Sequence, residues 1–297
     1  MSINLPGKAP RFLVRFWGVR GSIPSPGPAT ARYGGNTSCV SVEGEYADGT
    51  PTVGIFDAGT GIRLLSRELA HSDKEIILFL SHTHWDHIQG FPFFAPLRQA
   101  DRPIYLSSME QEMGLFQLLL AQVDGKRFPL RLEDAGAKLL RFTPEKIAEQ
   151  QRLGYQVQRI RANHPGVAFG LRADLRGMRL IYFPDNELFP PAGSDTQHTT
   201  FAEMAEFCRG ADLLIHGAQY TEADMPAKHG WGHSVVSQVR ELAAAAQVKH
   251  LVLFHHDPDR SDDELDRFQG ESEEWFRANA PEIRCTVAFE GLAISLP

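Results

Sequence analysis

The fold is indicated by a short run of metal-binding residue types that directly follows an apolar stretch. The run is Ser81-His82-Thr83-His84-Trp85-Asp86-His87, and the stretch before it, Glu75–Leu80, has the composition of a buried strand. Neutral imidazole and carboxylate are the usual nitrogen and oxygen ligands of zinc-like ions, so this density of histidine and aspartate indicates a metal site. In an extended segment His82 and His84 project to one side and can share one ion.

The same run suggests a second ion. If the chain turns into a helix after His84, Asp86 and His87 can face a neighbouring ion. The ordinary alternative is a polar turn whose imidazoles bind the backbone. Several clustered histidines repel one another on protonation unless a metal holds them, so we favour the metal site.

Composition narrows the class of protein. The chain has 297 residues, of which 42% are hydrophobic and 23% charged, and its formal net charge is −7. These values exclude disordered and fibrous classes, and the net acidity argues against broad electrostatic binding of nucleic acid. The 12 histidines outnumber the 3 cysteines, Cys39, Cys208 and Cys285, which lie too far apart for a disulfide framework. With no membrane span and no signal peptide evident, we expect a reduced, cytoplasmic protein.

Alternating strand and helix patterns run along the chain. Strands are predicted at 12–17, 39–43, 52–56, 75–80, 155–162, 167–173, 178–183, 213–215, 251–254 and 283–289. Helices are predicted at 61–70 after the cap candidate Thr60, and at 109–123, 201–208, 235–246 and 262–278, where Ser261 and Glu264 form a capping box. Strands in both halves with helices between them predict an α/β fold with two helix-covered sheets, formed as one domain over residues 1–297.

The histidine run resembles the hallmark of the metallo-β-lactamase superfamily, His-x-His-x-Asp-His at a strand end. That resemblance implies an αββα sandwich of two mixed sheets flanked by helices. It also implies further ligands at later strand ends, and His164, Asp185 and His255 match them in order and context. Asp57, in Phe56-Asp57-Ala58-Gly59, resembles the earlier structural aspartate of the superfamily.

The resemblance implies two divalent ions, zinc first, with manganese, iron or nickel also compatible. One ion is expected on His82, His84 and His164. The other is expected on Asp86, His87 and His255, with Asp185 bridging the pair. His256 is the alternative to His255, which we prefer because it directly follows an apolar strand.

Other segments resemble the phosphodiesterase branch, which includes tRNase Z and phosphoribosyl cyclic phosphodiesterases. These segments are Phe16–Pro24, Tyr33–Ser38 and Gly232-His233-Ser234. The resemblance makes His233 a catalytic proton donor or phosphate-binding group, and Ser234, His216 and Arg20 substrate-binding candidates. Ile215-His216-Gly217-Ala218 departs from the tRNase Z His-Glu-Ala-Thr element, because glycine replaces the glutamate.

Two features argue against a tRNA-sized substrate. In tRNase Z an arm that grips tRNA is inserted between the third histidine ligand and the bridging aspartate. Here His164 and Asp185 are 21 residues apart, enough for two strands and a turn. The extra length lies instead around residues 91–150, where we expect a lid-like insertion. Its Phe91-Pro92-Phe93-Phe94 run suits either base stacking or core packing.

We therefore expect a binuclear metal-dependent phosphodiesterase that acts on a small cyclic or short nucleotide through a metal-bridging hydroxide, with Asp86 and His233 as catalytic residues. No membrane partner is expected, and a homodimer is compatible with the sequence. The alternatives are hydrolysis of a lactone, thioester or β-lactam, and a non-catalytic ligand-sensing module. A redox di-iron site is disfavoured because His84 stands where flavodiiron proteins usually carry glutamate.

Overall fold

The computed structural model describes residues 2–4, 11–107 and 113–297. The chain divides into two compact units. The first comprises Met1–Gly18, Asn36–Tyr155 and Glu290–Pro297, and the second comprises Val19–Gly35 and Gln156–Phe289. Each unit is built around one β-sheet.

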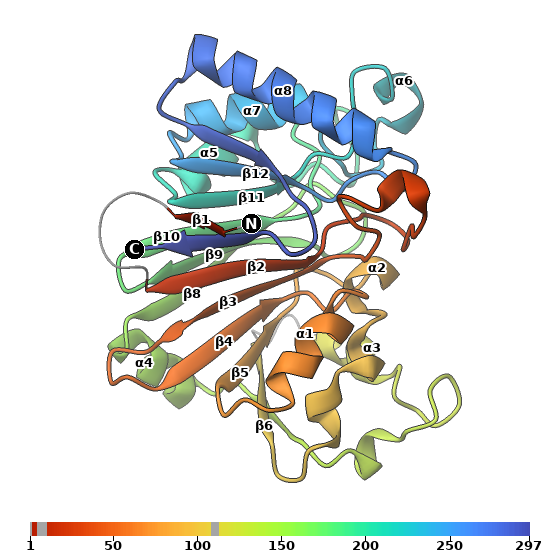
Figure 1. The fold of residues 1–297 in the computed structure, drawn as a ribbon, viewed down its shortest axis with the longest axis vertical. Coiled ribbons are helices and arrows are strands. Elements are labelled where there is room, and N and C mark those ends of the chain that lie inside the picture. The colour runs from red at the N-terminus through yellow and green to blue at the C-terminus, as the bar shows by residue number, and fades with distance from the viewer. Residues whose placement is uncertain (1, 5–10, 108–112) are drawn as a thin grey trace. The chain divides into compact units, whose positions relative to one another are not determined.

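The first unit carries a mixed sheet that brings both ends of the chain together. Its described strands lie in the order β1 (Ser2–Asn4), β14 (Ala293–Leu296), β2 (Phe12–Gly18), β3 (Cys39–Glu45), β4 (Pro51–Phe56), β5 (Glu75–Phe79), β6 (Pro103–Ser107) and β7 (Lys138–Arg141) (Figure 1). Pairing is antiparallel from β14 to β4 and parallel from β4 to β7. Buried and partly exposed residues alternate along β2, as expected where one sheet face is covered.

Short helices connect the strands of this unit. They are α1 (Ile62–Leu69), α2 (Trp85–Ile88), α3 (Met113–Leu120) and α4 (Pro144–Arg152), with 3-10 turns η2 (Phe91–Phe93), η3 (Ala95–Arg98) and η5 (Leu132–Asp134). Helix α4 begins at a cap, because the Thr143 hydroxyl accepts a hydrogen bond from the Lys146 amide. Residues 108–112, which include the start of the helix predicted at 109–123, lie outside the described residues.

The second unit carries a mostly parallel sheet. Its strands follow the order β13 (Arg284–Val287), β12 (His250–Phe254), β11 (Leu213–Gly217), β10 (Met178–Phe183), β9 (Phe169–Leu175) and β8 (Tyr155–Arg161). The four strands from β13 to β10 are parallel, and β9 is antiparallel to β10. Parallel neighbours end at the same edge, so the residues that follow β10, β11 and β12 are brought together there.

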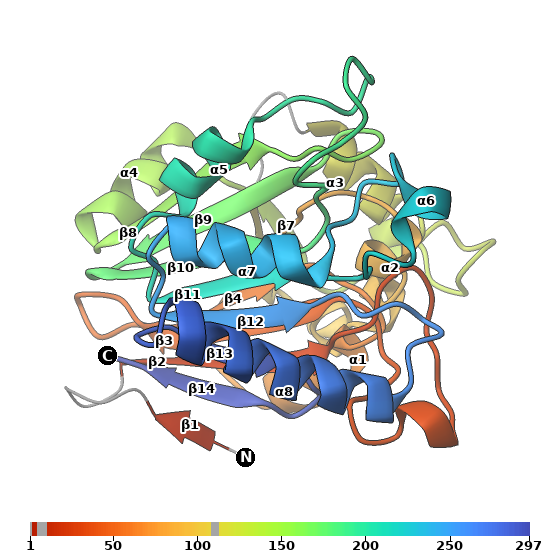
Figure 2. The same cartoon turned by 90° about the horizontal axis from the view of Figure 1, so that it is seen from above.

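Helices cover this second sheet. They are α5 (Phe201–Cys208), α7 (Val236–Ala245) and α8 (Asp262–Asn279), and Figure 2 shows α7 and α8 lying over β11, β12 and β13. Two shorter elements, η1 (Pro28–Thr30) and α6 (Met225–Lys228), lie in loops. Buried apolar side chains of α5, α7 and α8 join those of the sheet in one core cluster. The capping box predicted at Ser261 and Glu264 is present, and Thr200 with Glu203 forms another at α5.

The prediction of an α/β fold with two helix-covered sheets is confirmed, and each of the ten predicted strands exists within a few residues of its predicted bounds. The patterns missed β1, β6, β7 and β14, which are short strands at or near the ends of the first sheet, and they missed α4. Thr60 was wrong as a cap: its hydroxyl accepts a hydrogen bond from the Thr37 amide, and Gly61 precedes α1 without a side-chain cap. No helix in the described ranges is long and apolar enough to cross a membrane.

Leu242 of α7 tests the packing of the second unit. Its side chain is fully buried in the core cluster, so Leu242→Ala should lower the free energy of unfolding by about 2–5 kcal/mol. The neighbouring Glu241 is exposed on the same helix, and Glu241→Ala should change stability by less than about 0.5 kcal/mol. Urea denaturation of both variants measures the difference, and equal effects would contradict this packing.

Candidate metal centre

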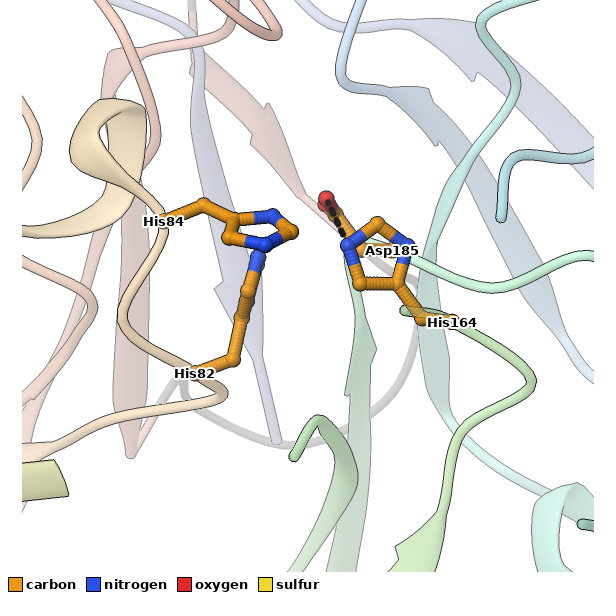
Figure 3. Close-up of side chains that lie close together, drawn as sticks. All are labelled: His82, His84, His164 and Asp185. Carbon is orange, nitrogen blue, oxygen red and sulfur yellow. Dashed lines mark ion pairs between the residues drawn. The ribbon is translucent and has the colours of Figure 1, made fainter. Parts of the chain in front are cut away.

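The histidine run of the first unit adopts the strand–loop–helix course that the sequence predicts. Strand β5 ends at Phe79, His84 is extended with φ −61° and ψ 151°, and α2 begins at Trp85. The ring centroids of His82 and His84 lie 4.6 Å apart, and the rings meet edge to face at 76° (Figure 3). His82, Asp86 and His87 are buried, whereas His84 is exposed.

Asp57 anchors this run from the end of the neighbouring strand β4. Its backbone has φ 60°, an uncommon value outside glycine, and its side chain is fully buried. One carboxylate oxygen accepts the Ser81 amide at 2.7 Å, and the other accepts the Ser81 hydroxyl and contacts His87 Nδ1, both at 2.7 Å. The carboxylate therefore fixes both ends of the histidine run and orients the His87 ring.

The second unit brings three more predicted ligands together. Asp185 follows β10, His255 follows β12, and His164 lies in the loop between β8 and β9. His255 Nε2 is 3.1 Å from one Asp185 oxygen, and His164 Nε2 is 3.6 Å from the other (Figure 3 draws the second contact). His255 has φ 57°, so it too adopts a backbone conformation that is rare for a residue with a side chain.

The hydrogen bonds of these rings define which nitrogen carries the proton. His164 Nδ1 is 2.9 Å from the Gly232 carbonyl oxygen, and His255 Nδ1 is 2.9 Å from the Gln219 side-chain oxygen. Carbonyl oxygens only accept, so both Nδ1 atoms donate, and each ring in its neutral form then presents the Nε2 lone pair to the Asp185 carboxylate. A lone pair facing a carboxylate at 3.1–3.6 Å is repulsive unless a cation lies between them.

His87 repeats the pattern in the first unit. Its Nδ1 contacts the Asp57 carboxylate, and its Nε2 is 3.1 Å from an Asp86 oxygen. His82 likewise contacts the Ser81 hydroxyl through Nδ1, at 3.1 Å. Imidazoles fixed through Nδ1 with Nε2 facing a carboxylate are the arrangement that metal-binding histidines adopt, so the donor set fits zinc-like ions. Burial raises the pKa of Cys208 and Cys285 to about 12, so neither is a thiolate at neutral pH.

His255 and His256 differ in where each ring is held. His256 is buried, its Nε2 is 2.8 Å from the Ala288 carbonyl oxygen, and burial lowers its pKa to about 3. The His256 ring is therefore neutral, and its hydrogen bond lies within the second unit. His255, in contrast, has a donor atom within 4.8 Å of those of Asp185 and His233. This geometry favours His255 as the ligand.

His233 lies beside the candidate ligands of the second unit. Its ring stacks on His255 at a centroid distance of 5.2 Å and 21°, and its Nδ1 is 3.9 Å from an Asp185 oxygen. The side chain is 12% exposed, so it is accessible to a small ligand. Gly232, just before it, has φ 87°, and a Cβ there would lie 2.3 Å from His164 Nδ1. Only glycine fits at this position.

Glu187 organises the loop that carries His233, a role that the sequence analysis missed. Its fully buried carboxylate accepts hydrogen bonds from the Gly230 and Gly232 amides at 3.0 Å. In the sequence it follows Asp185 and Asn186, which reads as an ordinary polar turn. One sequence feature could have indicated this role: the loop with Gly230 and Gly232 has backbone amides that need an acceptor.

Two predicted substrate-binding residues have structural contacts instead. Arg20 is fully buried, and its guanidinium donates to the carbonyl oxygens of Gly34, Asp257 and Arg260 at 2.7–3.0 Å. Ser234 is also buried, and its hydroxyl donates to the Asn186 carbonyl oxygen at 2.6 Å. Each side chain is enclosed and binds the backbone of the second unit, so these contacts do not support the predicted substrate contacts, which stay predictions.

His216 and Gly217 end strand β11. His216 is fully buried, its Nδ1 is 2.8 Å from the Gly217 carbonyl oxygen, and burial lowers its pKa to about 4. The neutral His216 ring is buried against Phe183. Such a ring is better placed to stabilise the strand ends than to contact substrate. Any Cβ at Gly217 would lie 1.8 Å from the Pro184 carbonyl oxygen. The missing glutamate therefore reflects a close approach of two strand ends.

Base stacking and core packing were the two roles predicted for the Phe91–Phe94 run, and its phenylalanines differ in exposure. Phe91 and Phe94 are 0% and 1% exposed, and both belong to the core of the first unit. Phe93 is 53% exposed and lines a cavity with Trp85. Core packing therefore explains two of the four residues.

Comparison with known proteins identifies the class. A family model described as "Beta-lactamase superfamily domain" matches residues 55–256, so the chain belongs to this family and is a metal-dependent hydrolase. A protein named Ribonuclease Z from Picrophilus torridus is 23% identical over 286 residues, covering 84% of this chain and 86% of its own length.

Solved structures share the fold across nearly the whole chain. "A New Diphosphatase from the PhnP Family" superposes with a TM-score of 0.63 at 18% identity, covering 97% of this chain and 98% of its own. Zn(2+)-bound PqqB from Methylobacterium extorquens gives 0.64 at 18% identity, covering 96% of this chain and 100% of its own. These likenesses establish the metallo-β-lactamase fold that the sequence indicates.

Gly217 provides a test of the strand-end contact. Gly217→Ala should lower the free energy of unfolding by about 1–3 kcal/mol, because the new Cβ meets backbone that cannot rotate away. Gly270 in α8 is the matched control: nothing lies within 4 Å of a Cβ there, so Gly270→Ala should raise stability by up to about 1 kcal/mol. Thermal denaturation measures whether each substitution lowers or raises stability. An unchanged stability of Gly217→Ala would contradict the contact.

Proposed function

We propose that this hydrolase is a phosphodiesterase with two divalent ions, acting on a small cyclic or short nucleotide-type phosphodiester. The observation that carries the proposal is the position of His233. Its imidazole lies against His255 and Asp185, is partly accessible, and is held by a loop that Glu187 fixes. Loss of an alkoxide from phosphorus requires a proton donor, and a histidine outside the ligand set supplies one.

The proposed ligand sets follow the superfamily pattern. His82, His84 and His164 hold one ion, Asp86, His87 and His255 hold the other, and Asp185 is shared. The Nδ1 contacts of His82, His87, His164 and His255 support this assignment, because each leaves Nε2 as the ligand atom. Imidazole and carboxylate donors suit zinc first, and manganese or iron as well.

When bound, two such ions activate water as a nucleophile at neutral pH and neutralise charge on a phosphoryl oxygen. The side chains do the remaining work. Asp86, which is buried beside His87, orients the attacking water. His233 binds the phosphoryl group and then donates a proton to the departing oxygen.

A small substrate is supported by the residues between His164 and Asp185. They form β9, β10 and the Arg176-Gly177 turn, which leaves no length for a tRNA-gripping arm in this interval. The net charge of −7 also disfavours a long polyanion. The PhnP-family diphosphatase, whose fold is similar, is named for a diphosphate substrate.

His233→Ala distinguishes a phosphodiesterase from a hydrolase of carbonyl substrates. With metal-loaded protein, kcat/KM for a cyclic nucleotide should fall by about 10²–10⁴-fold, because its alkoxide leaving group needs the proton that His233 donates. Cleavage of bis-p-nitrophenyl phosphate should fall much less, because p-nitrophenolate leaves without a proton. Asp86→Ala serves as the inactive control. A harmless His233→Ala together with efficient lactone opening would overturn the proposal.

Metal analysis of the same variant separates a proton donor from a ligand. His233 belongs to a group with Asp185 and His255 whose donor atoms lie within 4.8 Å of one another. We expect His233→Ala to retain the metal content of the parent protein. Loss of one equivalent would instead make His233 a ligand.

Gln219 tests the positioning of His255. Gln219→Ala removes the acceptor of the His255 Nδ1 proton, so metal affinity should fall by about 10–100-fold. Gln151→Ala, at an exposed position of α4, is the matched control and should leave affinity unchanged. Chelator competition measures both, and unchanged affinity in Gln219→Ala would show that this contact does not orient a ligand.

A further inference from the structure

A cavity of about 540 Å³ lies within the first unit, beside the histidine run. This volume falls in the range of small-molecule sites. Its apolar wall is formed by Trp85, Phe93, Phe128 and Leu118, and its polar lining includes Gln89 and Gln122. The catalytic chemistry proposed above uses none of these side chains.

Exposed apolar side chains gather at this cavity. Trp85, Phe93 and Leu118 are 80%, 53% and 57% exposed, and they are three of the eight large hydrophobic residues exposed in the described part of the chain. Trp85 is the most exposed of the eight. Contiguous apolar surface at a concave site is the usual mark of a ligand-binding wall.

The cavity is connected to the candidate ligands through the chain itself. Thr83 and Trp85 line it, and they alternate with His82, His84 and Asp86 along one segment. Trp85 stands directly between His84 and Asp86 in the chain, so a ligand held at Trp85 lies at the segment that carries these two candidate ligands. This arrangement suits a substrate whose reacting group is joined to a ring by a short linker.

The aromatic wall is held in place from behind. Phe93 and Phe128 meet edge to face at a centroid distance of 5.1 Å, and the guanidinium of Arg98 lies 5.9 Å from the Phe128 ring. Phe93 belongs to η2, between the buried Phe91 and Phe94. The two rings thus support each other, and Phe93 is flanked in the chain by buried neighbours.

Gln122 adds a polar feature to the cavity. Its side-chain nitrogen is 3.0 Å from the Ile88 carbonyl oxygen and 3.2 Å from that of Leu119, which fixes the amide orientation because both partners only accept. Among the described residues, nothing donates to the Gln122 side-chain oxygen. That oxygen suits an N–H donor on a planar heterocycle.

We propose that this cavity is the base subsite of the enzyme. It binds the aromatic heterocycle of a nucleotide by stacking on Trp85 against the Phe93–Phe128 wall, while the phosphodiester lies beside His84 and Asp86. The inference rests on the proposed phosphodiesterase function and narrows its substrate to one that carries a nucleobase. Trp85 is the residue that determines this specificity.

Equilibrium binding of two matched ligands tests the proposal. Adenosine 5′-monophosphate and ribose 5-phosphate share a sugar and a phosphate and differ in the base. With metal-loaded full-length protein, the first should bind at least about fivefold more tightly, the lower end of what base stacking contributes. Trp85→Ala should abolish this advantage without changing the affinity for ribose 5-phosphate, and Trp85→Phe should retain most of it.

Tryptophan fluorescence gives a second readout. Adenosine 5′-monophosphate should quench emission in the parent protein and in Trp275→Phe, whose tryptophan lies on α8 of the second unit, but much less in Trp85→Phe. Equal affinity for the two ligands, or an advantage that survives Trp85→Ala, would overturn the base subsite.

Hydrolysis separates failure of this inference from failure of the proposed function. Cleavage of phosphodiesters with no preference for a base, unaffected by Trp85→Ala, leaves a phosphodiesterase and removes the base subsite. Binding of neither phosphate ligand, together with turnover of lactones alone, removes both.

Discussion

The candidate metal site depends on the repulsion between histidine Nε2 lone pairs and the carboxylates that they face. His164 and His255 each donate their Nδ1 proton to a carbonyl-type oxygen, so both Nε2 lone pairs face Asp185. His87 stands in the same relation to Asp86. A cation between nitrogen and oxygen turns this repulsion into ligation, which explains why the surrounding residues hold the rings so firmly.

Much of the molecule serves to keep those rings in place. Asp57 holds the histidine run of the first unit through three contacts, and Glu187 holds the glycine loop that accepts the His164 proton. Asn163 accepts two amides and donates to two carbonyl oxygens, which fixes the residue just before His164. These anchors are buried polar groups that are costly to leave unpaired, so the site and the stability of each unit are coupled.

The departures from relatives have structural causes that bear on function. Gly217 cannot carry the expected glutamate, because the Pro184 carbonyl oxygen occupies the place of its Cβ. The interval before Asp185 contains two strands and a turn, whereas 76 residues lie between His87 and His164. In that region Phe93 and Leu118 turn outward at a cavity while their neighbours fill the core. The base subsite proposed above would therefore lie in the first unit.

By itself, the sequence determined the family, the two-sheet fold and the candidate ligands, because ligand spacing and strand periodicity are local properties. It could not determine which residues lie behind those ligands. Arg20 was predicted to contact substrate and its guanidinium donates to three carbonyl oxygens, whereas Glu187, for which the sequence predicted no role, anchors a distant loop. Only the tertiary structure shows which acceptor lies within reach of each ring, because such contacts join distant parts of the chain: His255 contacts the Gln219 side chain and His256 the Ala288 carbonyl oxygen, which favours the residue that the sequence order already preferred.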